Sequence, residues 1–184
     1  MRVAKAKGTV VVEVVKSLRR NRERALELIP EKLHHYLQER IVVASWYPLD
    51  DYLVLLRAVG KIMSPKGGMA VFEKMGREAA RTHMDGTYSR LKNQTNRQAS
   101  FTLLTSMYDS GELRVLEREP GHAVLEFAGF AQPARELCET FTGYQLERMS
   151  IQGFEDVHVK HTRCRGDGQP ACLWEVSWKG RQLL

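Results

Sequence analysis

The residues best suited to chemistry lie in the last third of the chain, which contains all three of its cysteines. Cys164 and Cys172 bracket a seven-residue loop, and His161 stands three residues before Cys164. The third cysteine, Cys138, lies on an expected helix. Three thiolates and one imidazole form the donor set of a closed tetrahedral zinc site, which holds structure together and leaves no open position for catalysis. These four residues are therefore candidate ligands of a structural zinc ion.

Two other interpretations of the cysteines stay open at this point. Cysteine is among the most buried residue types, so Cys138 on an apolar helix stripe could simply fill the core. A disulfide between Cys164 and Cys172 would close the loop, although a reducing compartment disfavours it. The odd number of cysteines, and the lack of an apolar signal segment near the start, favour a cytoplasmic location.

The elements around these residues are a helix and a hairpin, together spanning residues 133–179. Apolar residues recur at helical spacing from Pro133 to Met149, with the proline in the first turn. Alternating residues predict a strand that ends near His161 and a second strand from Cys172 to Trp178. A tight loop between these strands would bring Cys164 and Cys172 together, with the helix packed over that end.

The preceding chain predicts mostly helices. The β-branched run from Thr9 to Val15 is typical of a strand, which we expect over residues 8–16. Helical patterns then follow to Leu28, over 31–40, behind Asp50 and Asp51, over 69–84 and over 97–108. A hairpin around Pro120 and Gly121 joins strands at 113–118 and 123–128. The expected fold class is α+β, with a helical layer on an antiparallel sheet in a single domain, 1–184.

Aromatic and sulfur-containing residues on several of these elements could surround a cavity between the helices and the sheet. Ligand sites are mostly apolar with a few polar groups, and His83 and Tyr88 could supply such groups. The alternative is a filled core, because such stripes are first of all packing. The candidate cavity residues are Trp46, Phe72, Met75, His83, Tyr88, Phe101, Tyr108, Phe127 and Trp174.

Charge and motifs narrow the functional classes. The formal net charge of +6 comes largely from a basic run at residues 16–24, which we interpret as a solvated helix face, because no nucleic-acid-binding signature accompanies it. No segment has the roughly 18 apolar residues of a membrane span. No nucleotide-binding loop, nucleophile elbow or metalloprotease motif occurs, so we expect no catalytic activity. None of the histidines, which include His34, His35, His83, His122 and His158, lies in a motif that marks haem ligation.

The segment from His161 to Trp178 resembles the C-terminal signature of four-vinyl-reductase-type sensor domains: a cysteine, a short Gly-Asp loop, a second cysteine and an aromatic-rich strand. Trp46-Tyr47-Pro48-Leu49 and Met75-Gly76-Arg77 are similar to a set of uncharacterised, mainly myxobacterial proteins. The resemblance is specific over about residues 133–179 and looser over 8–130. It implies the fold shared by haem–nitric-oxide sensors and vesicle-tethering subunits, with zinc held by three cysteines and a carboxylate. His161 stands where that carboxylate would be.

Together these features predict a zinc-stabilised domain that senses a small apolar or aromatic molecule. Since the chain shows no output domain, we expect the signal to pass to a protein partner or through a homodimer. The strand expected at Thr9 to Val15 could pair with a second subunit. The alternative is a non-catalytic interaction module of the same fold, with a filled core and no ligand.

Overall fold

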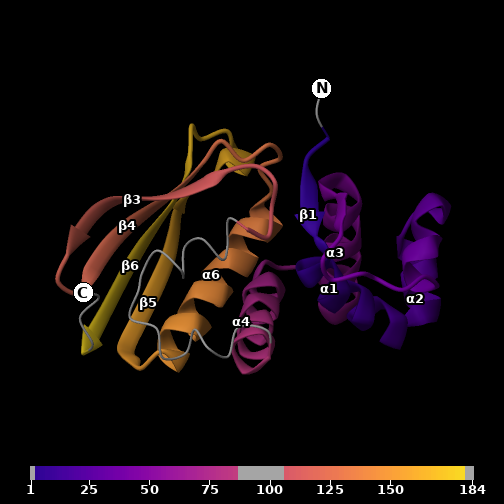
Figure 1. Ribbon diagram of the computed structural model, residues 1–184, viewed down its shortest axis with the longest axis horizontal. Helices are drawn as coiled ribbons and strands as arrows, with labels where there is room; N and C mark the ends of the chain where they lie inside the picture. The colour runs from indigo at the N-terminus through magenta and orange to yellow at the C-terminus, as the bar shows by residue number, and fades with distance from the viewer. Residues whose placement is uncertain (1–2, 87–105, 181–184) are drawn as a thin grey trace.

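The computed structural model describes residues 3–86 and 106–180. The N-terminal helices form one half and the antiparallel sheet forms the other, with helices α4 and α6 between them (Figure 1). The N-terminal half consists of β1 (Lys5–Lys7), α1 (Gly8–Arg20), α2 (Arg22–Leu28), the 3-10 helix η1 (Glu31–Leu37), β2 (Trp46–Pro48) and α3 (Leu49–Met63).

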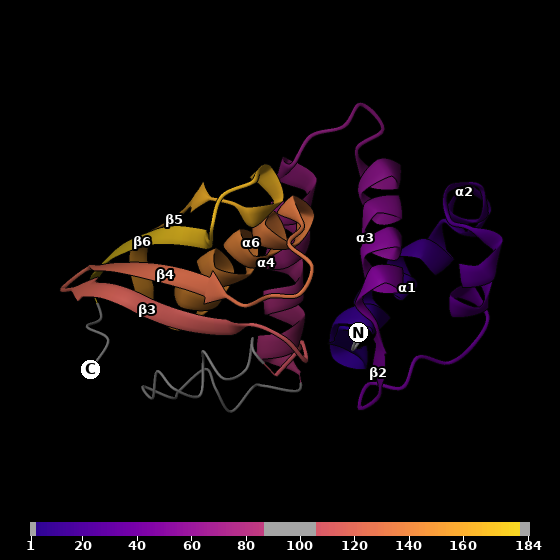
Figure 2. The same ribbon diagram turned by 90° about the horizontal axis from the view of Figure 1, so that it is seen from above.

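The second half is built on a four-stranded antiparallel sheet with the order β3-β4-β6-β5. Helix α6 packs on this sheet, and α4 packs on α6, so that α4 faces the N-terminal helices (Figure 2). This arrangement confirms the predicted α+β class. The elements are α4 (Ala70–Asp85), β3 (Glu112–Glu119), β4 (His122–Ala128), α6 (Arg135–Ile151), β5 (Phe154–Arg163), the short 3-10 turn η3 (Arg165–Asp167) and β6 (Cys172–Gly180).

The strand predicted over residues 8–16 is wrong, because this segment forms helix α1. Val11, Val14, Val15 and Leu18 follow the i, i+3, i+4, i+7 pattern of a helix face, and all four are buried. Burial of this face outweighs the weak preference of valine for strands. The N-terminal strand is β1, which covers only Lys5–Lys7. The free strand on which the homodimer prediction rested is therefore not present at residues 9–15.

Most of the other predicted elements within the described residues agree with the structure, although the helix predicted over 31–40 is the 3-10 helix η1, Glu31–Leu37. The hairpin around Pro120 and Gly121, the helix carrying Cys138 and the two final strands are confirmed. The helix predicted over 97–108 falls mostly on residues 97–105, outside the described residues. No helix in the described ranges is long and apolar enough to cross a membrane.

Strand β1 joins the two halves of the molecule. On one side it pairs with β2, where Ala6 lies opposite Tyr47, and on the other side Ala6 bridges to Tyr108. The backbone N–H of Lys7 donates to the carbonyl of Met107 at 2.8 Å. One short strand therefore links the N-terminal helices to the segment that precedes the sheet.

Helices α4 and α6 cross at two glycines. A Cβ atom at Gly76 would lie 1.9 Å from the carbonyl oxygen of Thr140, and one at Gly143 would lie 1.8 Å from that of Glu73. No side chain fits between these backbones, so glycine is required at both positions. The crossing fixes α4 closely against α6.

Two arginines of the basic run have structural contacts. Arg19 donates from Nη2 to the carbonyl of Tyr36 at 3.0 Å, and Arg22 donates from Nη1 to that of Leu37 at 3.0 Å. The carbonyl groups in the last turn of a helix lack hydrogen-bond donors within the helix, and the two arginines supply donors for these carbonyls of η1. Part of the basic run therefore holds α1 and α2 against η1.

Candidate metal centre and adjoining cavity

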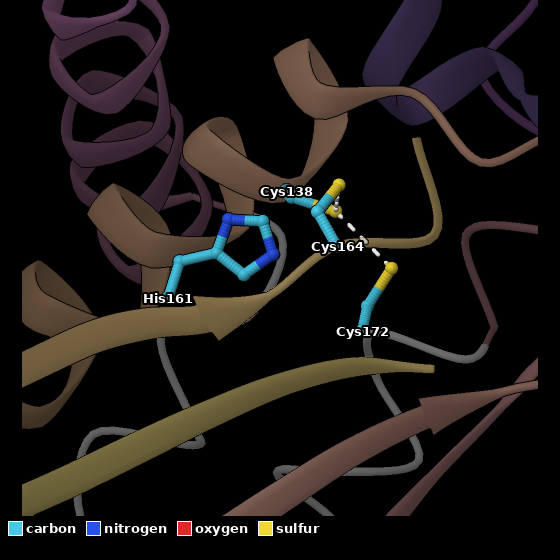
Figure 3. Close-up of side chains that lie close together, drawn as sticks. All are labelled: Cys138, His161, Cys164 and Cys172. Atoms are coloured by element: carbon cyan, nitrogen blue, oxygen red, sulfur yellow. Dashed lines mark hydrogen bonds between the residues drawn. The ribbon is translucent and has the colours of Figure 1, made fainter. Parts of the chain in front are cut away.

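The four predicted ligands converge in the structure (Figure 3). Their donor atoms all lie within 4.8 Å of one another, and the Sγ atom of Cys138 lies 3.6 Å from that of Cys172 and 3.9 Å from that of Cys164. A tetrahedral zinc ion with Zn–S bonds of about 2.3 Å holds its sulfurs about 3.8 Å apart. The observed separations match this spacing and far exceed the roughly 2.05 Å of a disulfide bond. All three cysteines are free thiols.

Separate elements place these side chains. Cys138 comes from the first half of α6, His161 from the end of β5, and Cys172 from the first residue of β6. Cys164 precedes the η3 turn, and its carbonyl accepts the N–H groups of Asp167 and Gln169, each at 3.1 Å. These bonds fold the loop back on itself, so the two hairpin cysteines meet under α6.

His161 is oriented by neighbours on two sides. Its Nδ1 atom lies 3.2 Å from the Oε1 atom of Glu139 on α6, which leaves Nε2 on the side of the three sulfurs (Figure 3). Its ring stacks on that of Trp174, with centroids 4.8 Å apart and planes at 14°. A carboxylate on the outer nitrogen of a histidine is the usual second partner in zinc sites, where it fixes the tautomer and the ring orientation.

The thiols also polarise one another. Hydrogen bonds from Cys138, His161 and the backbone N–H of Arg165 lower the pKa of Cys172 to about 4, against the effect of its burial. The hydrogen bond to Cys172, together with burial, raises the pKa of Cys138 well above its usual range. The lowered pKa of Cys172 favours its thiolate, which is the form that metal binding needs.

A cavity of ≈ 280 Å³ adjoins this cluster. It lies between α1 and α3 on one side and α4, α6 and the sheet on the other, and its walls are mainly apolar. Cys138 and Cys172 belong to the wall, as does Trp174, which is completely buried and stacks on His161. The cavity and the cluster of four candidate ligands therefore share a boundary.

The structure brings together five of the nine predicted cavity residues, namely Met75, His83, Tyr108, Phe127 and Trp174. Trp46 does not contribute, because it lies on β2 at the surface with 43% of its area exposed. Phe72 does not line the cavity either, since its ring packs against Gly60 between α3 and α4. Tyr88 and Phe101 lie outside the described residues.

Sequence reasoning missed one wall of the cavity and one partner of the metal ligands. Val10, Val14 and Tyr52 line the cavity from α1 and α3. For Val10 and Val14 on α1, the available signal was the helical period of residues 11–18, which the β-branched composition concealed. Glu139, which orients His161, is the carboxylate next in sequence to a predicted ligand.

Comparison by sequence identifies no relatives. No protein-family model matches this chain, and a search of curated proteins gives no significant match. The fold, however, has clear counterparts among solved structures. They are H-NOX domains, which have the haem–nitric-oxide sensor fold.

Three of these structures show the extent of the likeness. A single-residue variant of Tt H-NOX has a TM-score of 0.65 at 14% identity, covering 95% of each chain. An S. oneidensis H-NOX protein in the Fe(II) ligation state has a TM-score of 0.63 at 12% identity, covering 96% of this chain and 97% of that one. An oxygen-binding H-NOX domain related to soluble guanylate cyclases has a TM-score of 0.62 at 14% identity, again covering 95% of each chain.

These likenesses confirm the sensor-type fold that the sequence resemblance implied. At such low identity they show the fold alone. They do not assign the chain to the four-vinyl-reductase family or to the mainly myxobacterial set.

Proposed function

We propose that this protein is a non-catalytic domain that binds a small apolar or aromatic molecule between its layers and uses a structural zinc ion to hold one wall of the cavity. The observation that best supports this proposal is that the ligand cluster and the cavity share a boundary. Two of the four clustered donors, Cys138 and Cys172, also line the cavity. A structural zinc site contributes on the order of 10 kcal/mol to folding. An ion here would therefore fix the position of this wall.

The zinc proposal rests on the chemistry of the donor set. Sulfur with one imidazole nitrogen suits Zn²⁺ and not the hard oxygen-binding cations. With four protein ligands the ion has no open position, which agrees with a structural role. The resemblance of residues 133–179 to four-vinyl-reductase-type sensors supports the same proposal, because those domains bind zinc near their C-terminus.

Haem is the group that the structural neighbours suggest, since they include an H-NOX protein in the Fe(II) ligation state, an oxygen-binding H-NOX domain and an H-NOX structure that probes the function of heme distortion. The cavity of ≈ 280 Å³ falls below the range of about 300–1,000 Å³ that holds drug-sized ligands, and haem is larger than most of these. All six histidines lie in the described residues, and only His83 lines the cavity. Its ring contacts Tyr144 at 5.7 Å between centroids and the backbone of Thr9. These residues do not fit a haem.

A sensing role also needs an output, which we propose to be a separate protein that distinguishes the occupied from the empty form. A ligand can shift such an equilibrium only by its difference in affinity for the two forms. An interaction module without a ligand is the competing proposal, but it calls for a filled core. The cavity at the layer interface favours the sensor.

Native mass spectrometry of freshly purified protein tests the proposal, because it reports metal, co-purified ligand and oligomeric state together. We expect one zinc ion per chain, confirmed by elemental analysis of protein purified without added metal. A metal content of zero would refute the zinc site. If none of the small apolar compounds tested binds the zinc-loaded protein, the ligand-binding role is refuted and the interaction module is favoured.

A further inference from the structure

The cavity reaches the surface between α1 and α4, because the charged and mostly exposed residues of its lining lie on these two helices; this opening is its mouth. Four charged residues line it there, with Glu13 and Arg20 on α1 and Lys74 and Glu78 on α4. Arg20, Lys74 and Glu78 are exposed, and Glu13 is half-buried. The apolar interior therefore opens to water through a charged rim.

The two carboxylates of this rim are neutralised by neighbouring cations. Lys16 lies 2.9 Å from Glu13, and Arg81 lies 2.8 Å from Glu78. Arg20 and Lys74, in contrast, form no ion pair with any described residue. The rim thus presents two uncompensated positive charges at the opening.

The tyrosine and histidine side chains of the interior offer hydrogen bonds but no charge. Burial raises the pKa of Tyr52 to about 12 and raises that of Tyr108 well above its ordinary value, while burial lowers the pKa of His83. These side chains are neutral at physiological pH. An ionised ligand group placed among them would lose its hydration without gaining a counter-charge, which is strongly unfavourable.

The metal centre cannot receive a charged group either. Cys138 and Cys172 line the inner wall, but with four protein ligands the zinc ion has no position left for another. The charged part of a ligand is therefore confined to the rim, and the body within the cavity is uncharged.

On the basis of the proposed function, we propose that the ligand is a small amphipathic carboxylic acid. Its apolar body fills the cavity, and its carboxylate stays at the mouth, where it pairs with Arg20 and Lys74. Arginine presents a planar pair of donors that matches a carboxylate, and lysine adds a point charge. The two cations then act as the selectivity element of the site.

Three naphthalene compounds that differ only in the polar group test this proposal: 2-naphthoate, 2-naphthylmethanol and 2-naphthylmethylamine. Binding to the zinc-loaded full-length protein is measured by calorimetry at low and high salt. We expect 2-naphthoate to bind about tenfold or more tightly than the alcohol, the scale of one charge-assisted hydrogen bond. We expect the amine to bind least, and the advantage of the acid to shrink at high salt.

Substitutions then test whether the preference for the acid depends on the two cations of the rim. Arg20→Gln with Lys74→Gln should abolish the preference for the acid and leave the affinity for the alcohol unchanged. The matched control is Arg24→Gln with Lys61→Gln, which removes the same charge from two exposed positions that do not line the cavity. This control should keep the preference.

The outcomes separate the two proposals. If the alcohol or the amine binds as tightly as the acid, or if the control pair of substitutions lowers the preference equally, the carboxylate head is refuted while the cavity remains a binding site. If none of the three compounds binds, the proposed function itself fails.

Discussion

The imidazole of His161 lies flat against the indole of Trp174, with ring planes 14° apart and centroids separated by 4.8 Å. Trp174 also donates from Nε1 to the Oγ1 atom of Thr142 at 3.0 Å, and it forms part of the cavity wall. The candidate metal ligand His161 and the cavity wall thus both contact the side chain of Trp174. This contact makes the tryptophan a natural reporter of the metal centre.

Removal of zinc with a chelator should change the fluorescence of Trp174. Loss of the ion releases His161, which loosens the stacked pair and admits water, so the emission should shift to longer wavelength. Trp174→Phe should abolish this shift, whereas Trp46→Phe should preserve it, because Trp46 is 43% exposed and lies on β2, outside the cluster. An equal shift in Trp174→Phe would mean that the metal does not act through this stacked pair.

Replacement of Cys164 by serine should destabilise the protein by more than about 3 kcal/mol, because loss of a structural metal ligand belongs to the most damaging class of substitutions. The measurement is the free energy of unfolding from denaturant titration. The parent protein treated with a chelator provides the comparison and should lose a similar amount. If Cys164→Ser and the parent unfold alike, the cysteines are core filler.

Gly143→Ala should destabilise the protein by about 2 kcal/mol or more, although alanine favours helices over glycine by about 1 kcal/mol. The added methyl would lie 1.8 Å from the carbonyl oxygen of Glu73, so α4 and α6 must separate. Ser150→Ala, on the exposed part of the same helix, is the control and should have little effect. Thermal melting distinguishes them, and a neutral result for Gly143→Ala would contradict the close crossing.

His83 should make stability fall as the medium becomes acidic. Burial lowers its pKa below the ordinary 6.5 in the folded protein, so below pH 6.5 the unfolded chain takes up a proton that the folded protein does not. The stabilisation from neutral His83 is complete above pH 6.5 and is lost as the pH decreases from there toward the folded-state pKa. The loss cannot exceed about 1.4 kcal/mol per pH unit.

Urea titrations of the parent and His83→Gln from about pH 5 to about pH 8 measure this effect. The difference in unfolding free energy between the two proteins isolates the contribution of His83, because the other titratable groups are present in both. The stability of the parent relative to the variant should decrease on the acid side. A constant difference across this range would show that His83 titrates normally.

Haemin added to the purified protein should not form a stable complex. The cavity is small for a porphyrin, and the single imidazole in its wall, His83, already contacts the backbone of Thr9. Absorption spectra should therefore remain those of unbound haemin, in the parent and in His83→Ala alike. A sharp Soret band that disappears in His83→Ala would instead identify His83 as an axial ligand.

The sequence predicted the convergence of the four candidate ligands better than the walls of the cavity, for a physical reason. Cysteine spacing around a short loop determines which thiols can meet, so Cys164 and Cys172 were recognisable without coordinates. Whether a residue lines a cavity depends on how the elements pack, which the local sequence does not determine. Trp46 is an example, since an aromatic residue before a helix is equally compatible with a core and a surface position.

Helix α1 shows a different limit of prediction from sequence. Its five valines satisfy the composition of a strand, while the positions of Val11, Val14 and Val15 satisfy the period of a helix. Only the partner surface decides between the two, because the helix buries that face against α3 and its neighbours. The α+β class was nevertheless correct, since it depended on the hairpins and the longer helices.

The backbone contact at Gly76 and Gly143 determines which helices can move relative to one another. Because α4 and α6 touch without intervening side chains, their contact resists the sliding of one helix past the other, and α6 also packs on the sheet. Since the cavity already opens to water between α1 and α4, a wider opening for a larger guest would require α1 and α3 to move away from α4, and the pairing of strand β1 would limit that movement.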